Sequence, residues 1–373
     1  MMRNAFMLPL RQATAIRRQQ CVVWRIGGGG TGPVRVVNPA LVQQLLPPLQ
    51  HQARRPISNC AVRCNAGNNN NNNNKSQQQS SSPLGPVGVA AALAAAEGGG
   101  RMERVVRPTI WDEFALRDRV AIVSGGNRGL GLEMALVLIE MGARTVYCVD
   151  LPAQPGKEWV AVQEYVKRMD DGGRLEYVSA DVRDQKAMWR VGEDIGDREG
   201  RMDVCVAAAG ILKAHRDCLE YPGEEFEEVM KVNTNGVLFT AQAAGRQMVR
   251  FGNRGSIILI ASMSGSITNK DHAWVSYNTS KSAVLQMARS MACELGPKGI
   301  RVNTLSPGHI YTSMTAAYLD AQPHLYEKWS GLNPLGRLGR PDELRGVIAW
   351  LASDASTFCT GSDILVSGGH HAW

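Results

Sequence analysis

Residues 119–131 read Arg119-Val120-Ala121-Ile122-Val123-Ser124-Gly125-Gly126-Asn127-Arg128-Gly129-Leu130-Gly131. The apolar run predicts a buried β-strand, and the glycines after it predict a turn into a helix. That helical pattern stops at Gly142, and residues 145–150 form a second β-branched and aromatic run that ends in Asp150. A strand, a glycine-rich turn, a helix and a second strand tipped by an acid predict a βαβ unit that binds a dinucleotide.

Each glycine of this turn has its own expected role. Gly125 permits the tight turn, Gly129 lets the backbone approach a pyrophosphate at the helix N-terminus, and Gly131 lets the helix pack closely. Asp150 follows Gly131 by nineteen residues, where a carboxylate can bind ribose hydroxyls. A purely structural glycine turn is the alternative, which the flanking strand, helix and acid disfavour.

Short apolar runs and helical patterns alternate along the rest of the chain. Further strands are expected at 174–179, 202–209, 256–261, 300–305 and 362–366, and long helices at 224–248 and 276–295. This alternation predicts an α/β fold with a doubly wound, mostly parallel sheet of the Rossmann type, whose ligands bind at the carboxyl ends of the strands. Six polar or small residues fall at that edge: Ser124, Asp150, Asp181, Gly210, Ser262 and Pro307.

A second informative stretch contains Ser262-Met263-Ser264-Gly265 and Tyr277-Asn278-Thr279-Ser280-Lys281. Lys281 lies on the same helix face as Tyr277, and a cation about 5 Å away is worth roughly 3 kcal/mol at an effective dielectric of about 20. We expect Lys281 to lower the pKa of Tyr277, so that the phenol exchanges a proton with a substrate whose oxygen Ser262 holds. A buried tyrosine beside a lysine stem on a packed helix would have the same spacing.

The N-terminal segment differs in composition from the rest. Residues 1–96 contain nine Arg, one Lys and no acid, which is +10 against +7 for the whole chain, so the remaining 277 residues carry about −3. The basic balance therefore belongs to this segment and does not indicate nucleic-acid binding. An asparagine run at 68–74 and small residues at 88–100 predict that residues 1–100 are a low-complexity leader and linker without a core.

Three further features bear on the compartment and the ligands. Arginine-rich, acid-free sequence at an N-terminus is similar to a mitochondrial transit peptide, and a cytoplasmic protein with a solvated tail is the alternative. No run of eighteen apolar residues occurs, which excludes a membrane-spanning helix. The eight cysteines lack regular spacing and predict free thiols, and the histidines lack ligand spacing, so we expect no metal site.

The order of these motifs resembles the short-chain dehydrogenase/reductase family over residues 116–373. The resemblance implies an enzyme that transfers a hydride between a nicotinamide cofactor and a CH–OH group, as a homo-oligomer that is commonly a tetramer. It implies that Tyr277 is the acid–base, that Ser262 is its hydrogen-bond partner, and that Lys281 holds the ribose. Asn233 would hold a water in a proton relay.

The resemblance also implies a set of cofactor contacts spread over the expected strand ends: Gly125, Asn127, Arg128, Gly129, Leu130, Gly131, Asp150, Asp181, Val182, Gly210, Tyr277, Lys281, Pro307, Gly308, Ile310 and Thr312. Asp150 favours NAD, because a carboxylate repels a 2′-phosphate. Arg128 favours NADP, because it could neutralise that phosphate, so NADP is the alternative cofactor.

The sequence departs from the family pattern at a few positions. Ala207 and Ala208 replace an asparagine pair, and Ser367 replaces an aspartate before the last glycines. Tyr277 follows Ser262 by fifteen positions, about two more than the commonest family spacing. The extra residues are expected to lie beside the substrate.

Polar and aromatic residues flank the expected substrate position: Asn269, Lys270, Asp271, His272, Trp274, His309, Tyr311 and Thr312. Such a set suits a small polyhydroxylated molecule better than a sterol or an acyl chain. The stretches around Ser262 and Tyr277 also resemble fungal polyol dehydrogenases of the arabinitol and mannitol types. The alternatives are a 3-oxoacyl or other carbonyl reductase, and a regulator or scaffold that only senses NAD.

Overall fold

The computed structural model describes residues 85, 87–97, 109–169, 172–213, 217–312, 315–316, 319–320, 322 and 324–373. Most of the predicted leader lies outside the described residues, so its transit-peptide and linker character stays a prediction. Within it, the small-residue stretch forms a helix, α1 (Gly88–Glu97).

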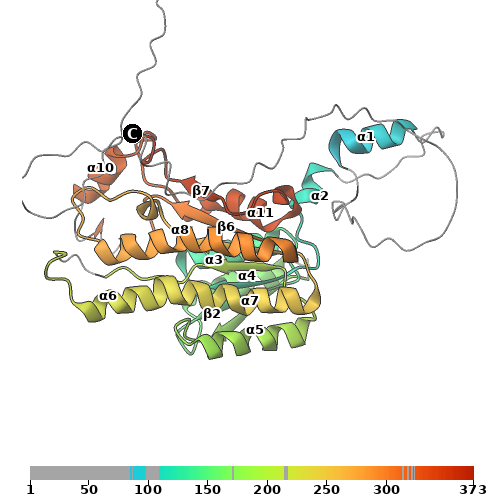
Figure 1. The fold of residues 1–373 in the computed structure, drawn as a ribbon, viewed down its shortest axis with the longest axis horizontal. Coiled ribbons are helices and arrows are strands. Elements are labelled where there is room, and N and C mark those ends of the chain that lie inside the picture. The colour runs from blue at the N-terminus through green and yellow to red at the C-terminus, as the bar shows by residue number, and fades with distance from the viewer. Residues whose placement is uncertain are drawn as a thin grey trace, which may run out of the picture. The chain divides into compact units, whose positions relative to one another are not determined.

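Seven parallel strands form one sheet in the order β3-β2-β1-β4-β5-β6-β7 (Figure 1). They are β1 (Val120–Ser124), β2 (Thr145–Asp150), β3 (Arg174–Ser179), β4 (Val204–Ala207), β5 (Gly255–Ile260), β6 (Ile300–Pro307) and β7 (Asp363–Val366). The order runs outward in both directions from β1, which makes the β1–β4 boundary the switch point where such sheets bind dinucleotides. The predicted doubly wound parallel sheet is confirmed, with the strand ends shifted by at most two residues.

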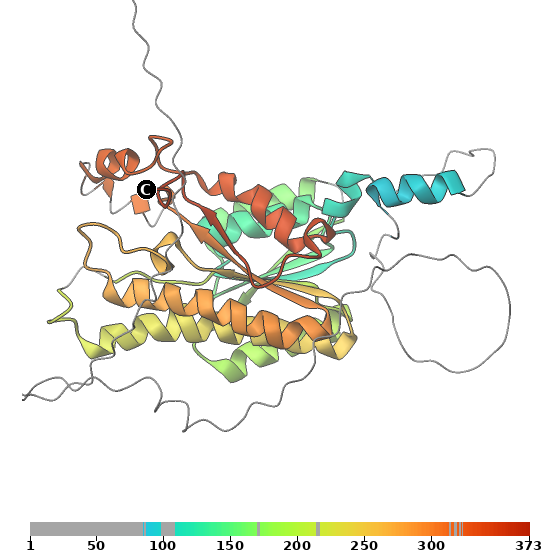
Figure 2. The ribbon, with the colours of Figure 1, turned by 45° about the horizontal axis from the view of Figure 1, so that its top comes forward.

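Helices pack on both faces of this sheet, as Figure 2 shows. One layer consists of α3 (Gly129–Glu140), α4 (Lys157–Arg168) and α11 (Arg345–Ala352), and the other of α5 (Gln185–Glu199), α7 (Val237–Phe251) and α8 (Val275–Leu295). Alternate residues of β1 enter opposite cores: Ala121 and Val123 face the first layer, and Val120 and Ile122 face the second. Burial on both faces explains why the central strands read as continuous apolar runs.

Shorter elements complete the part of the chain that the structure describes. They are α2 (Ile110–Phe114), α6 (Gly223–Met230), α10 (His324–Gly331), a π-helical turn η2 (Lys231–Gly236), and the 3₁₀ turns η3 (Met263–Gly265), η4 (Gly296–Lys298), η5 (Pro341–Leu344) and η6 (Asp354–Ser356). None of the described helices has the length and apolar character needed to cross a membrane. The five cysteines in the described residues are free thiols.

The helix predicted at 224–248 is confirmed, but its middle is a π-helical turn and not a regular α-helix. The chain forms α6, then the π-helical turn η2, then α7. The wide turn carries Asn233, whose side chain is fully buried and hydrogen-bonds the backbone of Ile211. A turn with an extra residue can insert a polar side chain into a site that a regular helix would bypass, and such turns occur often at functional sites.

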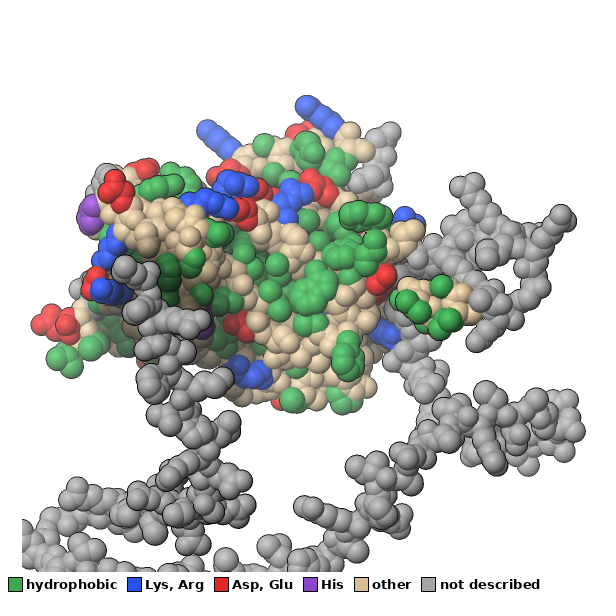
Figure 3. Space-filling view, turned by 90° about the horizontal axis from the view of Figure 1, so that it is seen from above, with side chains coloured by type: hydrophobic (Ala, Val, Ile, Leu, Met, Phe, Trp, Pro, Cys, Tyr) green, Lys and Arg blue, Asp and Glu red, His purple; other side chains and the backbone are tan. Residues whose placement is uncertain are grey.

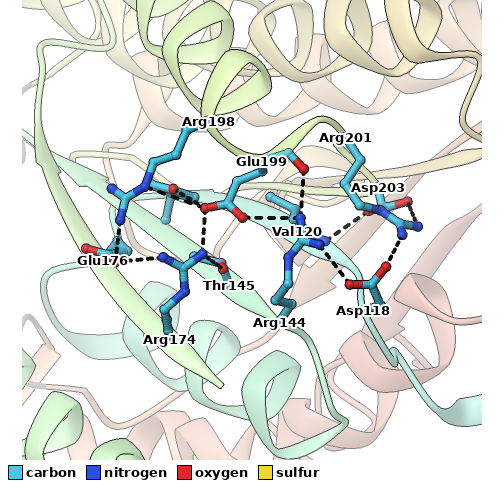
Figure 4. A network of polar contacts seen from close by, with 11 residues as sticks. Asp118, Val120, Arg144, Thr145, Arg174, Glu176, Arg198, Glu199, Arg201 and Asp203 are labelled. Carbon is cyan, nitrogen blue, oxygen red and sulfur yellow. Dashed lines mark hydrogen bonds and ion pairs between the residues drawn. The ribbon is translucent and has the colours of Figure 1, made fainter. Parts of the chain in front are cut away.

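An ion-pair network joins the amino ends of the first strands, opposite the predicted ligand edge (Figure 4). At its centre the Glu199 side chain is only 3% exposed. Its carboxylate accepts hydrogen bonds from Tyr147 Oη at 2.6 Å and Arg174 at 2.7 Å, and it pairs with Arg144 at 3.2 Å. Burial acts to raise the Glu199 pKa, but the hydrogen bonds from Tyr147 and Arg174 and the arginine charges outweigh it and lower the pKa.

Replacing Glu199 with glutamine should lower the free energy of unfolding by about 3 kcal/mol at pH 7, because breaking a buried charge pair leaves its partners uncompensated. A carboxyl whose folded pKa is depressed stabilises the fold above its unfolded pKa, and this stabilisation is lost as pH falls through the folded value. The difference between wild type and Glu199→Gln should therefore stay constant from about pH 7 to 5 and shrink below about pH 4.5. Urea unfolding across this range measures it.

Glu176→Gln is the matched control. Glu176 belongs to the same network through Arg174 and Arg198, but its side chain is 30% exposed. Exposed pairs contribute little, so this variant should lose less than about 1 kcal/mol. If the two variants lost equal free energy of unfolding at pH 7, the burial of Glu199 would not determine its contribution to stability.

Candidate active site

The glycine turn between β1 and α3 has the geometry that its sequence indicates. Gly125 and Gly129 have φ of +68° and +57°, in the left-handed region that favours glycine. A Cβ atom on Gly131 would collide with the Gly125 carbonyl oxygen, so glycine at 131 lets α3 pack against the turn. A Cβ on Gly129 would meet no atom within 4 Å, which leaves open space beside this backbone.

The N-terminus of α3 carries no side-chain cap. Its N-cap residue is Arg128, which is exposed and makes no capping hydrogen bond. The first N–H groups of a helix need partners from outside the helix, and together with the helix dipole they favour an anion. The open backbone at Gly129 and the uncapped N–H groups therefore fit the pyrophosphate of a dinucleotide.

Asp150 ends β2 beside this turn and is half-buried. Its carboxylate accepts the Asn127 N–H at 3.1 Å and the Leu151 N–H at 2.8 Å. The Asn127 side chain in turn accepts the Gly156 N–H at 2.7 Å. These bonds fix the carboxylate against the glycine turn, at the position expected for a residue that binds ribose hydroxyls.

Asp181 and Val182 follow β3 at the same edge of the sheet. The Asp181 carboxylate forms a forked pair with the Arg183 guanidinium, with distances of 2.7–3.0 Å. The Arg183 hydrogen bonds outweigh partial burial and lower the Asp181 pKa. Val182 is buried against η2, since a Cβ on Gly236 would lie 2.7 Å from Val182 Cγ2. Arg183, which the sequence reading did not single out, is thus the partner of Asp181, a predicted cofactor contact.

The segment after β6 supplies the remaining expected cofactor contacts. Pro307 pairs with β7, and a Cβ on Gly308 would lie 2.6 Å from Ser367 Cα, so only glycine allows this close packing. Ile310 forms a bridge to Gly339. Thr312 closes a small turn, in which its N–H donates to the Thr315 hydroxyl at 2.7 Å.

Ser262, Tyr277 and Lys281 meet where β5 ends and α8 begins. The Lys281 ammonium is buried and donates to the Ile260 carbonyl at 2.9 Å, and burial lowers its pKa to about 8. It lies 5.6 Å from the centre of the Tyr277 ring. The Ser262 Oγ accepts the Ser264 N–H at 3.2 Å, and the Ser262 side chain also hydrogen-bonds Tyr277.

The predicted lowering of the Tyr277 pKa by Lys281 is wrong for the polypeptide by itself. Desolvation of the phenol raises its pKa, and the hydrogen bond from Ser262 only partly offsets this effect. The physical reason is the position of Lys281, whose ammonium lies over the ring and is directed to the Ile260 carbonyl. Further positive charge beside the phenol is needed before it ionises at neutral pH.

Asn233 reaches this group from the π-helical turn. Its Oδ1 accepts the Ile211 N–H at 2.8 Å, and its Nδ2 donates to the Ile211 carbonyl at 3.0 Å and to Ser280 Oγ at 3.1 Å. A Cβ on Gly210 would lie 3.4 Å from Asn233 Oδ1 and 3.7 Å from Lys281 Nζ. The side-chain amide is bonded to protein groups, and its predicted water-holding role stays a prediction.

Ser280 is a site residue to which the sequence reading gave no role. Its hydroxyl is buried, donates to the Tyr277 carbonyl at 2.7 Å and accepts from Asn233. It thereby joins η2 to the helix that carries Tyr277. Its position three residues after Tyr277, on the same helix face, was the available signal.

Three of the residues expected beside the substrate, His272, Trp274 and His309, form an aromatic and imidazole group with Trp329. Trp274 contacts the Tyr277 ring edge-on with centroids 6.2 Å apart, and His309 stacks on Trp329 of α10 at 4.3 Å. Burial lowers the pKa of His309 to about 3, so this imidazole is neutral at neutral pH. The sequence reading missed Trp329, because only the fold brings α10 to this place. Among the described residues, no cluster of three or more His, Cys, Asp or Glu is arranged to hold a metal ion.

Known proteins with related sequences have the same architecture. Residues 125–371 match a family model described as "Enoyl-(Acyl carrier protein) reductase". Sorbose reductase of Schizosaccharomyces pombe is 36% identical over 260 residues, which cover 69% of this chain and 97% of that protein. The ribulose-forming D-arabinitol 2-dehydrogenase of Candida tropicalis is 34% identical over 269 residues, covering 70% and 95%.

Solved structures of dehydrogenases are also similar to this chain. A short-chain type dehydrogenase/reductase from Mycobacterium marinum has a TM-score of 0.65 and 36% identity, covering 70% of this chain and 99% of its own. A gluconate 5-dehydrogenase from Burkholderia cenocepacia, solved with NADP and tartrate, has a TM-score of 0.64 and 28% identity, covering 71% and 100%. The chain belongs to the short-chain dehydrogenase/reductase family and is an NAD(P)-dependent oxidoreductase.

Gly131→Ala should weaken dinucleotide binding by at least about tenfold, or ~1.4 kcal/mol, because the new Cβ would displace the Gly125 carbonyl and distort the turn. Fluorescence titration with NAD and NADP measures the affinity. Gly346→Ala in α11 is the control, since a Cβ there would meet no atom within 4 Å. Equal affinities in the two variants would show that the turn does not hold the cofactor.

Proposed function

We propose that this enzyme interconverts a sugar alcohol and the corresponding ketose, with Tyr277 as the general acid–base. The observation that carries the proposal is the meeting of Ser262, Tyr277 and Lys281 at the end of β5, on the same sheet edge as the glycine turn. Relatives named as sorbose reductase and D-arabinitol 2-dehydrogenase support a polyol and a ketose as the substrate pair.

Proton transfer is the work of the chain's own residues. In oxidation the Tyr277 oxygen takes the carbinol proton, while the Ser262 hydroxyl holds the substrate oxygen in place. Lys281 is fixed on the Ile260 carbonyl, and its ammonium lies 5.6 Å from the centre of the Tyr277 ring. A bound nicotinamide would supply the hydride acceptor for oxidation of the carbinol carbon. In ketose reduction the protonated phenol, which desolvation favours, returns the proton.

NAD is the proposed physiological cofactor. The Asp150 carboxylate is fixed beside the glycine turn by two backbone N–H groups, so a 2′-phosphate would be placed against a negative charge. Arg128 is exposed at the same turn and is the group that could accept such a phosphate. NADP is therefore the alternative, and the two side chains make opposite contributions to the choice.

A homotetramer is the proposed assembly. A groove of about 870 Å³ on the outer faces of α5, α7 and α8 exposes apolar side chains that include Val249, Met287 and Met291. At the other end of the sheet, β7 is a partly exposed edge strand, and the face at the top of Figure 1 carries a gathering of hydrophobic side chains (Figure 3). Two different self-complementary faces generate a tetramer. Light scattering that gives a monomer mass would contradict this assembly.

A mitochondrial location is proposed from the acid-free, arginine-containing residues 1–96. A fluorescent protein fused after residue 60 should be imported into mitochondria, and a second fusion with the leader arginines changed to glutamine should not. A cytosolic signal from the first fusion would leave the cytoplasm as the location.

The substrate proposal predicts NAD-linked oxidation of five- and six-carbon polyols, and reduction of their ketoses, in a panel assayed with both cofactors. The family model's description makes an acyl thioester reductase the second candidate, so the panel includes 3-oxoacyl and enoyl thioesters. Turnover of thioesters alone would contradict the polyol assignment. Cofactor binding without turnover of any alcohol, ketone or thioester would favour an NAD sensor.

Asp150→Ser should weaken the binding of NAD by about 1.5–3 kcal/mol, or roughly ten- to a hundredfold, because two ribose hydrogen bonds to a charged group are lost. The same change should strengthen the binding of NADP by a similar factor, because the repulsion between the Asp150 carboxylate and the 2′-phosphate is removed. Adding Arg128→Ala should abolish most of the NADP gain. The ratio of kcat/KM values for the two cofactors measures these effects, and a wild-type enzyme that prefers NADP would contradict the assignment.

A further inference from the structure

Two adjacent polar contacts join α10 to the loop that leads into α8. The Trp329 indole N–H donates to His272 Nε2 at 3.0 Å, and the Lys328 ammonium pairs with Asp271 at 2.8 Å. We name this pair of contacts the α10 clasp. It connects residues 57 positions apart in the chain, and Figure 2 shows α10 at the same end of the domain as the start of α8.

Aromatic rings continue from the clasp to the phenol. His272 stacks on Trp274 with centroids 4.3 Å apart, and Trp274 contacts both Trp329 at 6.3 Å and Tyr277 at 6.2 Å. Trp274 and Trp329 are only 7% and 3% exposed. On the other side of Trp329, His309 stacks at 4.3 Å. Ring contacts and a directional hydrogen bond to His272 therefore hold Trp329, and Trp274 lies between the rings of Trp329 and Tyr277.

The hydrogen bond defines the chemical state of His272. An imidazole nitrogen that accepts an N–H must carry no proton, so His272 is the neutral tautomer with its proton on Nδ1. Asp271 on the same loop pairs with Lys328 on α10, and Lys270 is a further charge near Asp271. The Trp329 bond is a directional contact to the neutral imidazole.

We propose that Trp329 and His272 are positioning residues that set how tightly the substrate binds beside Tyr277. The inference rests on the proposed polyol oxidation, in which the carbinol must reach the Tyr277 oxygen. The rings packed against Tyr277 then lie beside the carbon chain of the bound polyol, and the α10 clasp fixes the positions of these rings. Neither residue exchanges a proton with the substrate, and neither lies at the glycine turn, so the clasp acts on substrate binding beside Tyr277.

Trp329→Phe keeps a ring and removes the N–H donor. The variant should raise the KM for the polyol about five- to tenfold, the size expected for one lost hydrogen bond. Its kcat should stay within about twofold. Trp373→Phe is the matched control, because the Trp373 indole also donates one hydrogen bond, to the Leu332 carbonyl at 3.2 Å, but is 78% exposed. An unchanged KM in Trp329→Phe would overturn the proposal.

Substitutions at His272 separate the hydrogen bond from packing. His272→Gln offers a carbonyl acceptor and should retain most of the wild-type KM, whereas His272→Phe should raise KM as Trp329→Phe does. The double variant Trp329→Phe/His272→Phe should be no worse than either single variant, because both remove one contact. The proposal would be contradicted if the increases in KM of the two single variants multiplied in the double variant. It would also be contradicted if His272→Gln and His272→Phe raised KM equally, because the hydrogen bond would then have no positioning role.

Hydrogen exchange tests the clasp without any turnover. The amides of α10 should exchange faster in Trp329→Phe than in wild type, and Trp373→Phe should leave them unchanged. Unchanged exchange in Trp329→Phe would overturn the clasp whatever the substrate. Faster exchange in an enzyme that oxidises no polyol would support the clasp and would count against the proposed function alone.

Discussion

The buried Lys281 ammonium is the group on which the arrangement of the site depends. A buried charge is costly unless it is bonded, and Lys281 donates to the Ile260 carbonyl at the end of β5. This bond ties the catalytic helix to the sheet edge and places the ammonium over the Tyr277 ring, close to Gly210 at the end of β4.

The π-helical turn is the second part of the same construction. The Asn233 side chain hydrogen-bonds the backbone of Ile211, after β4, and the Ser280 hydroxyl of α8. One side chain thus connects the π-helical turn to the end of a strand and to the helix that carries Tyr277. Burial that raises the pKa of Tyr277 and lowers that of Lys281 keeps the phenol protonated in the polypeptide. Such a phenol is ready to act as an acid, and added positive charge converts it into a base.

The sequence alone was enough to predict those features that depend on the local residue type. Apolar runs of strand length located all seven strands, and Gly125, Gly129 and Asp150 lie as the βαβ pattern requires. It failed where contacts between distant segments decide the outcome. The π-helical turn at Asn233 depends on a contact with Ile211. The Asp181–Arg183 fork depends on a local side-chain conformation, and the Trp329–His272 contact depends on how α10 folds back. None of these leaves a periodic signal in the chain.

The role of Tyr277 is tested most directly by Tyr277→Phe, assayed for polyol oxidation and for NAD binding in the same preparation. The phenol oxygen is the proposed proton acceptor, so kcat should fall by about 10²- to 10⁴-fold, while NAD affinity and the fold are retained. Tyr165→Phe, at a tyrosine that is 54% exposed on α4, controls for loss of a hydroxyl. A Tyr277→Phe enzyme that oxidises polyols at the wild-type rate would contradict the account.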